Sequence, residues 1–171
     1  PGVRTDFLYF NLNDGKDADG KPFVDPAKRA WFADVRFRRA MAHALDRPAM
    51  VQNVFRGLAT PLDGLVPPSN KRWVNAGLPR YDYNQSRAKE LLQEAGFKLN
   101  AQKALEDGAG HAVEFTLLVA ENQPERKQMA AIIQEDLGKL GIKVHVAPVE
   151  AAAFNDFVLK KFTYDAAVHG S

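Results

Sequence analysis

The chain has 171 residues, which is enough for one domain with a sizeable hydrophobic core. Hydrophobic residues make up 46% and charged residues 26%, which is ordinary globular usage and excludes a disordered chain or a coiled coil. The net charge of +2 gives no sign of a nucleic-acid partner. The sequence has no cysteine, which excludes disulfides, thiolate catalysis and cysteine-bound zinc, and no apolar run approaches the length of a membrane span.

Residues 6–12 alternate as a β-strand does, and they are rich in aromatic residues that favour strands. We expect one apolar face and one mixed face, made respectively of Leu8, Phe10 and Leu12 and of Phe7, Tyr9 and Asn11. Residues 13–26 carry several Asp and Gly, which predicts a solvated loop. Their spacing does not match the calcium-binding loop of an EF-hand, so we predict no calcium site there.

Two consecutive helices are expected next. Asp34 and Asp46 have the spacing of N-cap residues in front of apolar stripes, and Gly57 is placed to end the second helix. The cluster of Arg36, Arg38 and Arg39 is interpreted mainly as part of a structural helix and only secondarily as a contact surface.

The middle of the chain is predicted to be irregular. Residues 58–83 contain four prolines and three aromatic residues with no sustained period, so we expect a long ordered loop whose rings pack on neighbouring elements. Asn84 is expected to cap a helix that Gly96 closes. Residues 98–111 are polar and contain glycine, which predicts a variable loop.

The C-terminal part has the most regular pattern. Strands and helices alternate there, and we expect β 113–119, α 124–140, β 142–149, α 151–161 and β 165–168. Asn122 and Glu125 have the spacing of a capping box at the start of the longer helix. This βαβαβ order predicts an α/β fold with a mixed, mostly parallel sheet and helices on both faces.

The familiar catalytic and metal-binding motifs are missing from the sequence. None of the three serines lies in a Gly-x-Ser-x-Gly elbow, the four histidines lie in separate elements, and no glycine-rich phosphate loop follows a strand. We therefore predict no catalytic residue, no metal ligand and no cofactor. What remains is recognition, because ligands of such sheets bind beyond the carboxyl ends of the strands. Glu121, Asn122 and Arg126 lie at such an end, although the same pattern also describes an ordinary capped helix.

The order of the segments is distinctive as a whole. The chain resembles the extracellular solute-binding proteins of family 5, the peptide-, oligopeptide- and nickel-binding components of ABC importers. The matching segments are FLYFNLN (7–13), FADVRFRRAMAHALDR (32–47), GLATP (57–61) with Pro67-Pro68, YNQSRAKELLQEAGF (83–97), IQEDLGKLGIKV (133–144) and YDAAVHG (164–170).

The resemblance implies a periplasmic-binding-protein-like fold in which residues 1–171 form a single ligand-binding lobe. That lobe is expected to be excised from a longer two-lobe protein, which agrees with a chain that begins at Pro1 without a signal segment. Family members close two lobes on a ligand by a hinge motion and then dock on a permease in the inner membrane. The implied location is the periplasm, or the outside of the cell as a membrane-tethered lipoprotein. An isolated lobe is expected to fold but to bind ligand weakly.

The resemblance also suggests which residues contact the ligand. In similar proteins the mixed face of the first strand faces the cleft, which places Phe7, Tyr9 and Asn11 there together with Glu121, Asn122 and Arg126 of the strand-to-helix turn. Peptide-binding relatives can carry an arginine on the last strand where this chain has Val168, and often a tryptophan where it has Ser171. Both departures leave the ligand open.

Two other functions stay open from the residues alone. One is a small α/β enzyme acting on a polar or anionic substrate through Glu121, Arg126 and a histidine, and the absence of a visible nucleophile–base pair weighs against it. The other is a sensory ligand-binding domain, which would share the lobe and differ in its partner.

Overall fold

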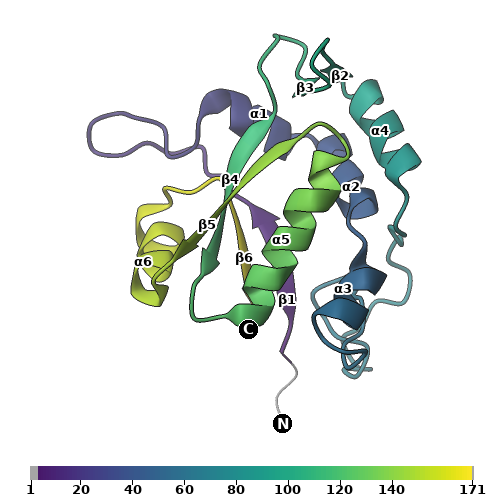
Figure 1. The fold of residues 1–171 in the computed structure, drawn as a ribbon. Coiled ribbons are helices and arrows are strands. Elements are labelled where there is room, and N and C mark those ends of the chain that lie inside the picture. The colour runs from purple at the N-terminus through teal and green to yellow at the C-terminus, as the bar shows by residue number, and fades with distance from the viewer. Residues whose placement is uncertain (1–3, 171) are drawn as a thin grey trace.

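A four-stranded sheet in the order β1-β6-β4-β5 forms the centre of the computed structural model, which describes residues 4–170 (Figure 1). The strands are Asp6–Phe10 (β1), Glu114–Ala120 (β4), Lys143–Val149 (β5) and Ala166–Gly170 (β6). Strand β4 pairs in parallel with both β5 and β6, whereas β1 pairs antiparallel with β6. The predicted mixed, mostly parallel sheet is confirmed.

Helices cover both faces of this sheet (Figure 1). Helix α5 (Pro124–Gly138) connects β4 to β5, and α6 (Ala151–Asn155) connects β5 to β6, so the predicted βαβαβ order is present. The remaining helices are α1 (Pro26–Ala33), α2 (Val35–Ala44), α3 (Arg47–Asn53) and α4 (Gln85–Glu94). Helix α2 packs against α4 and α5, on the same side of the sheet as α5.

Most helices begin at a residue whose side chain favours a helix start. The expected caps are found, because the side chains of Asp34, Asp46 and Asn84 accept hydrogen bonds from first-turn amides of α2, α3 and α4. Asp25 does the same for α1 and is followed by Pro26, a residue that suits the first turn of a helix. Helix α1 was not predicted, although this signal is present in the sequence.

Several expectations need correction. The capping box of Asn122 and Glu125 does not form, since the chain turns one residue later and Gln123 occupies the N-cap position without a side-chain hydrogen bond. Residues 98–111, expected to be a variable loop, contain a short hairpin of β2 (Lys98–Leu99) and β3 (Leu105–Glu106). The expected helix 151–161 changes after Asn155 into a π-helical turn, Asp156–Lys161.

The segment 58–83 contains no helix or strand. Its aromatic rings behave differently from one another. Trp73 is 68% exposed, so the expectation that it packs on a neighbouring element is wrong, whereas the ring of Tyr81 meets His43 edge-on at 5.5 Å.

Two hydrophobic clusters hold the layers together. The larger lies between the sheet and helices α1, α2, α4 and α5. At its centre four phenylalanine rings from β1, α1, α2 and β4 interlock at centroid distances of 4.9 to 6.1 Å, namely Phe10, Phe32, Phe37 and Phe115. The smaller lies under α6 and consists of Leu118, Ala120, Phe154, Val158 and Ala167. The alternation along β1 divides accordingly, because Leu8 and Phe10 pack on the larger cluster and Tyr9 on the smaller one.

Gly141, at the turn between α5 and β5, has a φ of +82°, and a Cβ there would lie 2.7 Å from the Lys103 carbonyl oxygen and 2.9 Å from the Leu105 nitrogen. Gly141→Ala should therefore lower the free energy of unfolding by about 2 kcal/mol or more. Gly138 is the matched control, because it ends α5 and a Cβ added there would have nothing within 4 Å, so Gly138→Ala should be neutral or stabilising. Urea unfolding of both variants checks this, and equal effects would contradict the packing described here.

Candidate functional site

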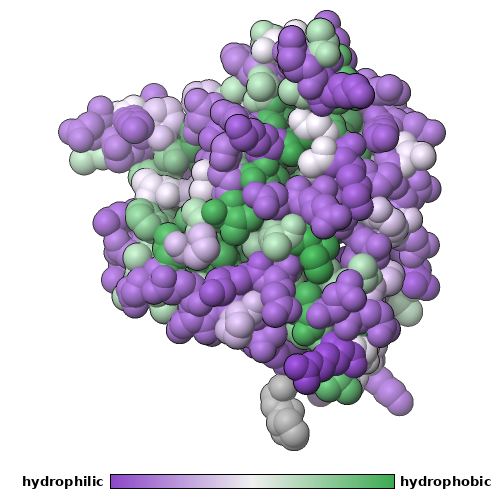
Figure 2. All heavy atoms as spheres, in the orientation of Figure 1, coloured by the Kyte–Doolittle hydropathy of each residue, from purple (hydrophilic) through white to green (hydrophobic). Residues whose placement is uncertain are grey.

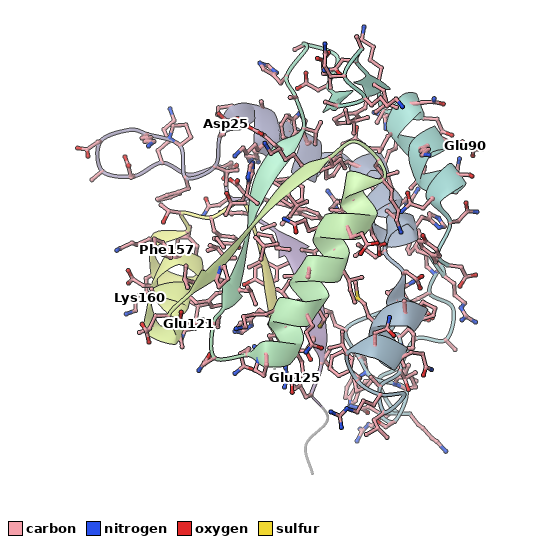
Figure 3. All side chains as sticks on the ribbon, in the orientation of Figure 1. Asp25, Glu90, Glu121, Glu125, Phe157 and Lys160 are labelled. Carbon is pink, nitrogen blue, oxygen red and sulfur yellow. The ribbon has the colours of Figure 1, made fainter. Side chains whose placement is uncertain are left out.

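The carboxyl ends of β4, β5 and β6 meet the start of β1 at one edge of the sheet. We call this edge the carboxyl edge and define it by Asp6, Phe7, Glu121, Asn122, Arg126 and His169. Figure 3 labels Glu121 and Glu125 at this edge, where β4 turns into α5. This is the location that an α/β sheet provides for ligands.

An ion pair joins the first turn of α5 to the start of β1. The Arg126 Nε donates to Asp6 Oδ1 at 2.7 Å, and the two side chains are only 10% and 8% exposed. The more exposed Arg4 contacts the other carboxylate oxygen at 3.0 Å. The pair uses the Nε of Arg126, and within residues 4–170 its terminal nitrogens form no hydrogen bond.

Gly170 closes the space beside this ion pair. A Cβ at that position would lie 2.6 Å from Asp6 Oδ1 and 2.8 Å from Arg126 Nη2, so no larger residue fits without moving the pair. The contact between Asp6 and Arg126 therefore requires glycine as the last residue of β6.

A small aromatic wall stands next to the ion pair on the α6 side of the sheet. The His169 ring stacks on Phe154 at 5.4 Å with an interplanar angle of 9°, and Phe7 meets His169 edge-on at 6.5 Å. Burial lowers the pKa of His169, the positive charge of Arg126 lowers it further, and Asp6 acts in the opposite direction. The lowered pKa favours the neutral form of the ring.

The β4–α5 turn presents the polar part of the site. Glu121 and Asn122 are both exposed, and the Glu121 amide donates to the Val149 carbonyl at 2.8 Å, which fixes the turn against the end of β5. No side chain among the described residues caps α5, and its first position is Pro124. The turn therefore offers a carboxylate, an amide and unpaired helix amides to a ligand that approaches this edge.

The structure thus brings Phe7, Glu121, Asn122 and Arg126 to one edge. Tyr9 lies one step further along β1, half-buried against Tyr164 at 5.8 Å, and burial, followed by the influence of Tyr164, raises its pKa to about 12. It extends the aromatic wall inwards.

Two residues expected at the ligand have structural roles instead. Asn11 is 3% exposed at the opposite end of β1, where its side-chain amide donates to the carbonyl oxygens of Phe162 and Tyr164, both at 2.8 Å. Val168 is fully buried in the larger core cluster. Neither side chain reaches the carboxyl edge. Asn11 follows the end of β1 that lies away from this edge, and the side chain of Val168 points to the α5 face of the sheet.

Two residues of this region, Asp6 and Phe154, were not predicted from the sequence. Asp6 lies 120 positions from Arg126 in the sequence, so no local sequence pattern predicts that the two side chains pair. Within residues 4–170, no group of three or more His, Asp or Glu side chains is arranged to hold a metal ion. The groups at the carboxyl edge are suited to binding through ring faces and hydrogen bonds.

The whole chain, residues 1–171, matches the family model described as "Bacterial extracellular solute-binding proteins, family 5 Middle". The chain belongs to this family. It is 35% identical over 154 residues to a probable ABC transporter-binding protein of Deinococcus radiodurans, covering 90% of this chain and 24% of that protein. It is 33% identical over 132 residues to the oligopeptide-binding protein AppA of Bacillus subtilis, covering 74% of this chain and 23% of AppA.

The solved structure of the oligopeptide-binding protein AppA from Bacillus subtilis in complex with a nonapeptide superimposes with a TM-score of 0.81 at 27% identity, covering 99% of this chain and 32% of that one. The family 5 resemblance predicted from the sequence is therefore confirmed, and so is the periplasmic-binding-protein-like fold. This chain spans about a quarter of the length of the curated relatives it matches. In the part of the chain that the structure describes, no helix combines the length and apolarity needed to cross a membrane.

The buried ion pair should stabilise the edge. Arg126→Met leaves the Asp6 carboxylate with only the exposed Arg4, and we expect it to lower the free energy of unfolding by about 2–3 kcal/mol. Asp6→Asn should cost a similar amount, and the double variant should cost clearly less than the sum of the two. A double-mutant cycle by urea unfolding checks this, and strict additivity would show that the two side chains do not interact.

The lowered pKa of His169 gives the stability a pH dependence. As the pH falls through about 6.5, the usual range of histidine, the unfolded chain takes up a proton before folded His169 does, so the free energy of unfolding should decrease. His169→Phe keeps a ring between Phe7 and Phe154 and should flatten this dependence between pH 7.5 and 5.5. An unaltered pH dependence in His169→Phe would contradict the assignment.

Proposed function

We propose that this chain is one lobe of the substrate-binding component of an ABC importer, and that its carboxyl edge forms half of a cleft for a peptide or similar small polar solute. The observation that carries the proposal is the composition of this edge, where an aromatic wall and an exposed polar turn flank the buried Arg126–Asp6 pair. A partly exposed surface of this kind needs an opposing surface to enclose a ligand.

The chemistry of the edge fits a peptide-like solute. The rings of Phe7 and His169 offer flat apolar surfaces to side chains, and the Glu121 carboxylate can accept hydrogen bonds from an amino group. The Arg126 guanidinium and the uncapped start of α5 can donate to carbonyl or carboxylate oxygens. The names of the relatives, an oligopeptide-binding protein and its nonapeptide complex, support this ligand class.

The proposal includes the partners and the place where the protein works. The opposing surface is the first lobe of the longer polypeptide, and the loaded protein delivers its solute to a permease in the inner membrane. The location is then the periplasm, or the cell exterior with a lipoprotein tether. Neither the geometry nor the relatives support the small enzyme considered from the sequence. A sensory domain shares this lobe, and transport of the bound solute in cells that carry the permease distinguishes the two.

Two substitutions in the full-length polypeptide test the proposed ligand surface. Phe7→Ala removes part of the aromatic wall, and Glu121→Gln removes the charge of the turn without changing its shape. Each should weaken peptide binding at least tenfold, which corresponds to about 1.4 kcal/mol. Binding is measured by calorimetry with a peptide selected from a library of tri- to nonapeptides.

The controls are matched in residue type or exposure and lie away from the edge. Leu159→Ala removes an exposed apolar side chain of the π-helical turn, and Glu135→Gln neutralises an exposed carboxylate near the far end of α5. Both should leave the affinity unchanged. Unchanged affinity in Phe7→Ala and Glu121→Gln, or equal losses in the controls, would refute the assignment of the ligand to the carboxyl edge.

A further inference from the structure

Arg126 is the only lysine or arginine within residues 4–170 that is buried, with 9% of its surface exposed. Taking a guanidinium out of water is costly unless a nearby negative charge compensates it. The Asp6 carboxylate supplies this charge, because it lies 2.7 Å from Arg126 Nε and its own side chain is 8% exposed. The pair lies at the carboxyl edge, so its charge balance bears on which groups can bind there.

Asp6 is held beside Arg126 by contacts on several sides. It is the first residue of β1 and pairs with Gly170, the last residue of β6, which lies beside the first turn of α5 (Figure 1). Arg4 Nε contacts its second carboxylate oxygen at 3.0 Å. A Cβ on Gly170 would lie within 2.8 Å of both members of the pair, so the end of β6 packs directly on them. A carboxylate of a solute would therefore meet Asp6 already in place, and not a free guanidinium.

The two charges of the pair oppose each other at the neighbouring groups. At the His169 ring, whose pKa is lowered mainly by burial, Arg126 lowers the pKa further and Asp6 raises it. Glu121 and Glu125 add negative charge, and their side chains form no hydrogen bond or ion pair within residues 4–170. Figure 2 shows a largely hydrophilic surface over this turn from β4 into α5. The edge therefore presents a compensated cation next to free carboxylates.

We infer that Asp6 determines the charge preference of the carboxyl edge: by holding Arg126 in a buried pair, it makes the edge select neutral carbonyl groups of the solute over carboxylates. This inference rests on the proposed function, because it concerns the solute of the same edge. A neutral carbonyl can accept a hydrogen bond from the terminal nitrogens of Arg126, which have no partner within residues 4–170. A carboxylate loses far more hydration on entering, and the positive charge that would compensate it is already paired with Asp6.

Peptides that differ in charge at a single position test the inference on the full-length polypeptide. The peptide selected from the library is synthesised with Gln and with Glu at each position in turn, and calorimetry gives the ratio of the two dissociation constants. At one position or more, the Gln peptide should bind at least about tenfold more tightly than the Glu peptide. This measurement needs no variant of the protein. Ratios near one, or a preference for Glu, at every position would overturn the inference.

Asp6→Asn keeps the size of the side chain and leaves the Arg126 guanidinium without its compensating charge. At the selective position the ratio should shift at least about tenfold towards the Glu peptide. Adding Arg126→Met to Asp6→Asn should bring the ratio back to within about threefold of the original value, because the charge that attracts the carboxylate is gone. If Asp6 had only a structural role, its loss would weaken both peptides equally and leave the ratio unchanged.

Asp136 provides the matched control, because it is a buried carboxylate, 3% exposed, that contacts Lys139 at 3.2 Å near the other end of α5. Asp136→Asn removes the same charge from the protein and should leave the ratio unchanged. An equal shift in Asp136→Asn, or no shift in Asp6→Asn, would overturn the inference. Absence of all peptide binding would contradict the proposed function as well, whereas binding that does not depend on peptide charge would contradict this inference alone.

Discussion

The pairing of the short strand β6 with both β1 and β4 is the constraint on which the rest of the structure depends. All five of its residues pair with the antiparallel strand β1, and Ala166 and Ala167 also pair with the parallel strand β4. Ala166, Ala167 and Val168 are fully buried, and their small side chains let the helical layers approach the sheet from both faces. Without β6, the start of β1 and the carboxyl end of β4 would not lie at the same edge.

The chemistry of the candidate site follows from that arrangement. Asp6 and Arg126 come from distant parts of the chain and meet because β1 runs opposite to β6 while β4 runs alongside it. Gly170 leaves room for their contact, and His169 turns to the α6 face, where Phe154 holds its ring flat. One short strand therefore positions both the ionic and the aromatic part of the edge.

Much of the fold could be predicted from the sequence because local signals and global topology agree. The caps Asp34, Asp46 and Asn84 marked helix starts, and alternating strands and helices after residue 113 implied a parallel sheet. Short elements escaped notice, since the two-residue strands of the 98–106 hairpin carry no period. Trp73 was expected to pack because it is aromatic, but its contacts depend on tertiary structure and it is exposed.

The site was harder to predict than the fold. The alternation of side chains along β1 correctly placed Tyr9 on the face opposite Leu8 and Phe10. It does not show how far along the strand a residue lies from the carboxyl edge. Asn11 is therefore on the expected face but at the end of β1 away from the carboxyl edge, where its side-chain amide donates hydrogen bonds to the carbonyl oxygens of Phe162 and Tyr164. Arg126 was identified by its place in a turn, whereas Asp6 became visible only when the sheet brought residues 6 and 126 together.

The proposed function requires this chain to form half of a clamp. The most direct test compares the affinity of one peptide for the 171-residue chain, with its folding verified by near-ultraviolet circular dichroism, and for the full-length polypeptide. We predict binding to the 171-residue chain at least about 100-fold weaker, because the opposing contacts and the closure of the lobes are absent. Equal affinities would contradict this function, since the chain would then contain a complete binding site.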